Sequence, residues 1–72
     1  MELLNEVLFM QTRLFSLFCE KNKIEPKEAD LLFKKYGIWN YIENCYDSLH
    51  LEGDDSIYTD IINILHSNNV VF

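Results

Sequence analysis

The first 22 residues of the chain show the widest hydrophobic face in the sequence. At 100° per residue, the apolar positions between residues 2 and 22 cover an arc of roughly 200°. An ordinary surface helix needs a narrower apolar stripe, so we expect a helix that is central in the fold or that faces a second surface. Two residues break the pattern, because Gln11 falls inside the apolar arc and Phe9 falls on its polar side.

The same helical rhythm returns three times in the rest of the chain. We expect these three helices near residues 26–36, 38–50 and 55–67. Leu31 lies opposite the apolar stripe of its segment, whereas Trp39 and Tyr46 lie at the edge of theirs. The isoleucine-rich last segment also suits a strand by composition, but its spacing favours a helix.

Glycine, proline and polar residues separate these segments. Pro26 suits the first turn of a helix, and we expect positive φ angles at Gly37 and Gly53, just past helix ends. The N-cap of the last helix is expected at Asp54, Asp55 or Ser56. A chain of 72 residues makes one domain. The sequence therefore predicts an all-α protein, a compact four-helix single domain over residues 1–72 with helices near 2–22, 26–36, 38–50 and 55–67.

Charge is divided unevenly between the two halves of the chain. The net charge is −6, and all six basic residues precede Tyr36, so residues 36–72 carry six carboxylates and no lysine or arginine. Such a surface repels phosphate backbones and favours a basic protein surface, although net charge also serves solubility alone. We therefore expect a protein partner, with no nucleic acid bound.

Location and cysteine chemistry follow from what the sequence lacks. It has no run of roughly 18 apolar residues, so no membrane span is expected. The first residues lack a basic start and a cleavage site, which indicates the cytoplasm. Cys19 and Cys45 are expected to be reduced and to pack as small hydrophobic residues.

Candidate chemistry is sparse along the chain. Histidine and cysteine do not recur at metal-ligand spacing, so neither a metal nor a cofactor is expected. Glu43, Asp47 and His50 form one polar stripe, but no nucleophile accompanies them and the stripe is expected to face solvent. We therefore expect a protein that is not an enzyme.

The segments 26–36 and 38–50, joined through Gly37, have the outline of a helix-turn-helix. A small DNA-binding regulator is thus an alternative. The exposed face of the second segment carries Glu43 and Asp47 but no cation, which opposes contact with phosphate.

Several apolar and aromatic residues lie outside or at the edge of the apolar faces that are expected to form the core. Aromatic anchors are enriched in binding hot spots, and we expect them to act with the acidic stripe. The predicted partner-binding residues are Phe9, Leu31, Trp39, Glu43, Tyr46, Asp47 and His50. The apolar end Val70–Phe72 is expected to dock on the domain or on the partner. A homodimer or larger homo-oligomer, paired through the wide face of the first helix, is the alternative.

The stretch from Phe18 to Ile62 resembles a family of short bacterial proteins known only as a domain of unknown function. The matching elements are Phe18-Cys19, Glu28-Ala29-x-x-Leu32-Phe33-x-x-Tyr36-Gly37, Tyr41-Ile42, Tyr46-Asp47-x-Leu49-His50-x-x-Gly53 and Asp60-Ile61. The resemblance implies a compact helical protein that is often encoded beside an ADP-ribosyltransferase-like protein of toxin type. It thereby implies an antitoxin-like or accessory role.

Overall fold

The computed structural model describes the backbone of residues 2–70 and the side chains of residues 5–70. Its four helices are α1 (Glu2–Asn22), α2 (Pro26–Lys35), α3 (Ile38–Leu49) and α4 (Asp54–Ser67). Residues 2–70 contain no strand, so the predicted all-α four-helix fold is confirmed. The helix ends differ from expectation by one residue at most, since Tyr36 and His50 are C-caps and α4 begins one residue earlier than predicted.

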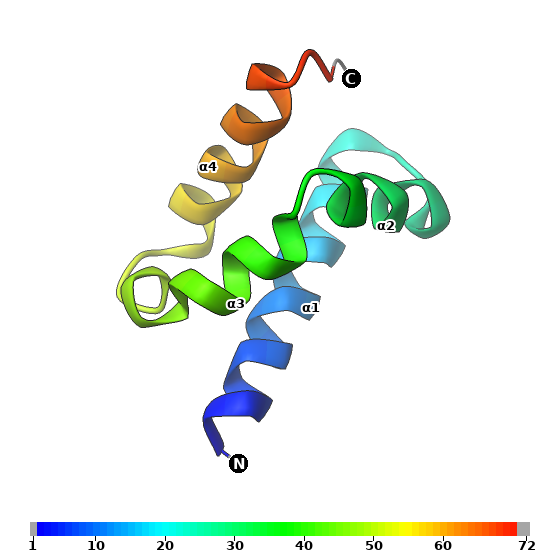
Figure 1. The fold of residues 1–72 in the computed structure, drawn as a ribbon. Coiled ribbons are helices and arrows are strands. Elements are labelled where there is room, and N and C mark those ends of the chain that lie inside the picture. The colour runs from blue at the N-terminus through cyan, green and yellow to red at the C-terminus, as the bar shows by residue number, and fades with distance from the viewer. Residues whose placement is uncertain (1, 71–72) are drawn as a thin grey trace.

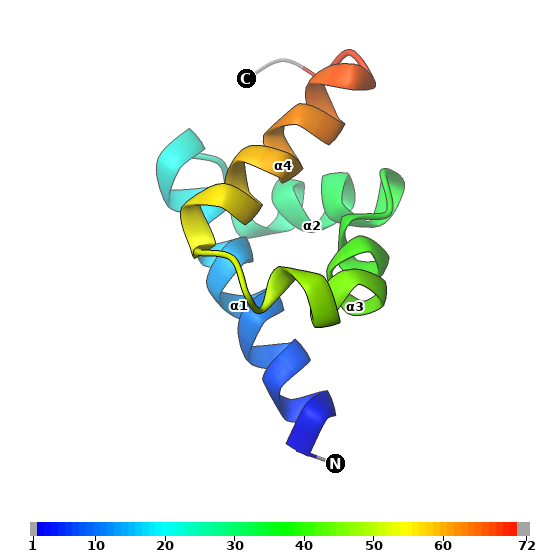
Figure 2. The same ribbon diagram turned by 90° about the vertical axis from the view of Figure 1, so that its left-hand side faces the viewer.

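Helix α1 is the central helix of the fold. It packs against α2, α3 and α4, and α3 crosses it (Figure 1). The N-terminal end of α1 extends past the other three helices in both views (Figures 1 and 2). The molecule is accordingly elongated, with extents of 34 × 21 × 20 Å. A wide apolar face thus serves a central helix, although Leu8, which lies in the expected apolar arc, is 52% exposed.

The core lies between the helices and consists of their periodic apolar positions. Its largest fully buried side chains are Phe18, Phe33, Leu14, Ile38, Ile42, Ile57, Ile61 and Leu65. Each buried side chain of this size contributes about 1.5–3 kcal/mol relative to exposure. The spacing of four residues along α4, from Ile57 to Ile61 to Leu65, explains why this isoleucine-rich segment is a helix and not a strand.

Four aromatic residues form a cluster where α1, α2 and α3 meet. We call this set, which consists of Phe15, Phe18, Phe33 and Trp39, the aromatic cluster. Phe33 lies at its centre, with ring centroids 5.3 Å from Phe15, 5.2 Å from Phe18 and 4.9 Å from Trp39. Phe15 and Trp39 stack at 5.2 Å with their planes 28° apart. Such offset and edge-on geometries are those that aromatic pairs prefer.

The polar atoms at the edge of the aromatic cluster are satisfied within the protein. Trp39 Nε1 donates to Asp30 Oδ1 at 3.1 Å, and Lys34 Nζ lies 2.9 Å from Asp30 Oδ2. Gln11 Nε2 donates to the backbone carbonyl of Trp39 at 3.0 Å. This bond explains why a polar residue occurs inside the apolar arc of α1, because it links α1 to the first turn of α3.

Of the two glycines, only Gly37 has the predicted left-handed backbone, with φ of 68°. The prediction for Gly53 was wrong, because its φ of −77° and ψ of 156° are extended. Tight turns end α3 before Gly53 is reached, since Glu52 N–H donates to the carbonyl of Leu49 at 2.9 Å. Left-handed residues occur instead at Lys23 and Asn69, which follow α1 and α4.

The expected cap of α4 was also wrong. Gly53 is the N-cap, and no side chain at this position bonds the first turn. Asp54 and Asp55 instead lie inside the first turn, where carboxylates interact favourably with the helix dipole. The Asp54 carboxylate is directed to Arg13 on α1, at 3.1 Å from Nε.

The chain end and the cysteines pack against the core where they are described. Val70 contacts the core, whereas Val71 and Phe72 lie outside the described residues. Cys19 and Cys45 are free thiols that lie half-buried beside the core. None of the described helices is long and apolar enough to cross a membrane.

Candidate partner-binding surface

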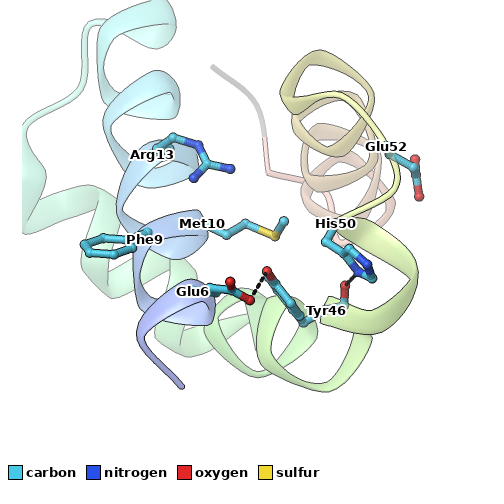
Figure 3. A pocket seen from close by; sticks show the side chains of 7 residues that line it. All are labelled: Glu6, Phe9, Met10, Arg13, Tyr46, His50 and Glu52. Carbon is cyan, nitrogen blue, oxygen red and sulfur yellow. Dashed lines mark hydrogen bonds between the residues drawn. The ribbon is translucent and has the colours of Figure 1, made fainter. Parts of the chain in front are cut away.

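A hollow of about 270 Å³ lies between α1, the last turn of α3 and the loop that follows α3. We call it the Tyr46 hollow. It is lined by Glu6, Phe9, Met10, Arg13, Tyr46, His50 and Glu52. In Figure 3 the α1 side chains of Met10 and Arg13 are directed toward the α3 side, where Tyr46 and His50 form the opposite wall.

Tyr46 is held in place by three contacts. Its hydroxyl donates to Glu6 Oε2 at 3.2 Å, and its ring stacks on His50 with centroids 5.2 Å apart and planes 16° apart. His50 Nδ1 lies 2.9 Å from the backbone carbonyl of Tyr46 (Figure 3). Desolvation and the hydrogen bond to Glu6 raise the pKa of Tyr46, so its hydroxyl remains a donor at neutral pH.

Phe9 lies on α1 at the edge of the Tyr46 hollow, with its ring turned outward. Its side chain is 66% exposed, and its ring lies on the side of α1 away from His50 (Figure 3). At 100° per residue, Phe9 lies half a turn from Phe18, which is fully buried on the core face. A large aromatic ring left this exposed beside a hollow is typical of an interaction surface.

A second hollow, of about 530 Å³, continues along α1 toward α4. It is lined by Thr12, Arg13, Ser16, Leu17, Glu20, Asp54 and Asp55. The two hollows share Arg13, so they adjoin. We call the residues that line both hollows the α1 trough.

The ion pair between Arg13 and Asp54 lies where the two hollows meet. Its two hydrogen bonds measure 3.1 Å from Nε to Oδ2 and 3.3 Å from Nη2 to Oδ1. The hydrogen bond that Arg13 donates to Asp54 raises the pKa of Arg13 above its ordinary value. Among the described residues that line the trough, Arg13 is the only lysine or arginine, against five carboxylates: Glu6, Glu20, Glu52, Asp54 and Asp55.

Five of the seven predicted partner-binding residues gather around Tyr46. Phe9 and His50 line the Tyr46 hollow with it. Glu43 and Asp47 are exposed and line a smaller hollow, of about 100 Å³, to which Tyr46 also contributes. The acidic residues of α3 therefore lie next to the Tyr46 hollow, because Tyr46 lines both hollows.

The other two predicted residues lie elsewhere. Trp39 is half-buried in the aromatic cluster. Leu31 is 65% exposed on α2, on the face opposite the fully buried Ala29 and Phe33. The structure therefore does not bring Leu31 or Trp39 to the α1 trough.

The sequence prediction missed several residues of this surface. Glu6 and Arg13 lie three residues before and four residues after Phe9, so helical spacing alone could have placed all three on one face. Asp54 is 41 residues from Arg13 in sequence. No local pattern could have paired those two.

The groups that the trough presents suit noncovalent contacts. They are carboxylates, one guanidinium, a phenol, an imidazole and apolar side chains. Within the described residues, no three His, Cys, Asp or Glu side chains are grouped to hold a metal ion. Carboxylates beside exposed apolar rings match the charge and hydrophobicity of a basic protein surface.

Comparison with known proteins gives a family but no described relative. No curated protein and no solved structure matches the chain. One family model, described as Protein of unknown function (DUF3791), matches residues 9–68. The match covers most of α1, all of α2, α3 and α4, and every trough residue except Glu6. The chain therefore belongs to this family of proteins of unknown function, DUF3791.

Proposed function

We propose that this chain is a small, non-enzymatic module that binds a protein partner through the α1 trough. The observation that carries the proposal is Phe9, an aromatic side chain that is 66% exposed beside the Tyr46 hollow. Burying such a ring against a partner removes apolar surface from water at roughly 25 cal/mol per Å². The stacked pair of Tyr46 and His50 offers a second, already ordered contact area across the hollow.

The charge of the trough supports a basic partner surface. Five carboxylates face one guanidinium, which is itself bonded to Asp54. A surface that carries charges of one sign associates faster with a partner surface of the opposite charge. This increase in association rate becomes smaller as the ionic strength rises. The exposed Glu43 and Asp47 on α3 extend the same negative field past Tyr46.

For the identity of the partner, we propose an ADP-ribosyltransferase-like protein of toxin type, in a bacterial cytoplasm. This part of the proposal depends on the resemblance of the Tyr46–Gly53 element to a family whose members are often encoded beside such proteins. The chain would then act as an antitoxin-like or accessory protein. Leu31 and Trp39 are left out of the proposed surface because neither lines the trough.

The test is co-elution of the chain with the product of a neighbouring toxin-type gene on a sizing column at micromolar concentration. We expect a complex whose affinity falls as salt is raised, because the trough is charged. Separate elution of the two proteins at low salt would reject this partner. A complex that forms without change in affinity between low and high salt would reject the acidic surface as the contact.

A homodimer is the second candidate, because Leu8 and Phe9 are exposed side by side on α1. A two-fold contact there would bring the carboxylate of Glu6 toward its own copy, which opposes pairing. Light scattering separates the candidates. A monomer at high concentration supports the partner proposal, and a dimer that the Phe9→Ala variant abolishes would assign Phe9 to self-association.

A further inference from the structure

The charged residues that α1 contributes to the trough recur at a regular spacing. Glu6, Arg13 and Glu20 are spaced by seven residues, so they lie on nearly one line along α1. Apolar positions lie between them, since Phe9 is 66% exposed and Leu17 is half-buried. The line alternates negative, positive and negative charge over 14 residues, which is about 21 Å of helix.

The wall opposite α1 reinforces the negative ends of this line. Glu52, Asp54 and Asp55 line the trough from the loop and from the first turn of α4. Asp54 accepts two hydrogen bonds from Arg13, whose side chain stays 53% exposed and open to a second acidic group. What remains unbalanced is the charge of the other four carboxylates, so an occupant with net positive charge is favoured.

The backbone of the occupant must satisfy its own hydrogen bonds. The described residues contain no strand, so an extended segment would find no sheet edge on which to pair its backbone. An α-helix carries its backbone bonds internally and presents apolar side chains at steps of three and four residues. A helix of about 14 residues would span the trough from Glu6 to Glu20.

Building on the proposed function, we propose that the α1 trough receives a basic amphipathic helix of the partner that lies along α1 with heptad register. Its basic residues, 14 positions apart, pair with Glu6 and Glu20. An acidic or small residue midway between them faces Arg13, and apolar residues contact Phe9 and Leu17.

The probe is a labelled 18-residue helical peptide built on alanine and glutamine. It carries arginine at peptide positions 2 and 16, glutamate at position 9, and leucine at positions 5, 6, 12 and 13. The matched control exchanges only the charges at positions 2 and 9, so that composition, net charge and the leucine face are unchanged. Binding to the full chain is measured by fluorescence anisotropy at low salt, and the contacted residues by backbone amide NMR shifts.

We expect the probe to bind at least fivefold more tightly than its control, with shifts along the outer face of α1 and the first turn of α4. The Glu20→Lys variant should lose this preference, and a peptide with glutamate at position 16 should restore its binding. Glu28→Lys makes the same charge change on exposed α2 and should leave the preference intact. Circular dichroism verifies that both variants fold.

Equal affinity of the two peptides, absence of binding at millimolar peptide, or shifts centred on α2 would overturn the helical register. The co-elution test is independent of these outcomes. A partner that co-elutes with the chain while the peptides bind without preference would leave the proposed function standing and remove this inference. A peptide preference without co-elution would reject the toxin-type partner alone.

Discussion

Aromatic side chains are packed against one another in the aromatic cluster, whereas that of Phe9 is exposed in the α1 trough. In the cluster, ring centroids lie 4.9–5.3 Å apart, and the indole N–H of Trp39 is satisfied by Asp30. In the trough, Phe9 is 66% exposed and the carboxylates outnumber lysine and arginine five to one among the described lining residues. The comparison shows that an aromatic residue stabilises this fold where its neighbours close around it, and becomes available to a partner where they do not.

A pair of alanine substitutions tests the difference between the aromatic cluster and the α1 trough most strongly. Phe33→Ala removes the fully buried centre of the cluster, and we expect a loss of about 3–5 kcal/mol in the free energy of unfolding. A domain of this size has a total stability of roughly 4–11 kcal/mol, so the variant loses between about a quarter and all of it. Urea denaturation followed by circular dichroism measures the change.

Phe9→Ala is the matched control on the same scale. We expect the free energy of unfolding to change by no more than about 0.5 kcal/mol, because the side chain is exposed. A loss of several kcal/mol in this variant would show that Phe9 belongs to the core and would remove it from the proposed surface.

A smaller effect is expected from Trp39→Phe. This variant keeps an aromatic ring in the cluster but removes the donor to Asp30. We expect a loss of about 1 kcal/mol in the free energy of unfolding, from the missing hydrogen bond. Circular dichroism must report it, because the chain has a single tryptophan. An unchanged stability would mean that the ring contacts alone fix Trp39.

Acid should weaken the hydrogen bonds at the edge of the aromatic cluster. The ion-paired hydrogen bond from Lys34 and the hydrogen bond from Trp39 lower the pKa of Asp30 below 3.8. A carboxyl with a lowered folded-state pKa stabilises the protein above its unfolded pKa, and that contribution is lost as pH falls through the folded value. We expect the thermal midpoint to fall below about pH 4, and to fall less steeply in Asp30→Asn. Identical acid profiles would exclude Asp30 as a source of this loss.

A small effect on stability is also expected at the exposed ion pair of the trough. The side chains of Arg13 and Asp54 are 53% and 42% exposed, so Arg13→Gln should cost less than about 1 kcal/mol of stability. The difference from the parent protein should shrink further in high salt. A large, salt-independent loss would make Arg13 a structural residue.

The helical rhythm predicted most of this fold, and it failed where distant contacts decide. Periodicity correctly placed Phe9 and Leu31 on exposed helix faces. It could not show that Gln11 bonds the Trp39 carbonyl, because these residues meet only after α1 and α3 pack. Periodicity also could not predict the extended backbone of Gly53, because the turns after α3 depend on where α4 docks.

We propose that the partner contacts α1 and not α2. The most direct measurement is the affinity of the co-eluting partner for the Phe9→Ala and Leu31→Ala variants, whose replaced side chains are 66% and 65% exposed. We expect the affinity to fall about tenfold or more for Phe9→Ala, which is at least 1.4 kcal/mol, and to change less than about twofold for Leu31→Ala. Equal losses, or a larger loss for Leu31→Ala, would contradict this proposal.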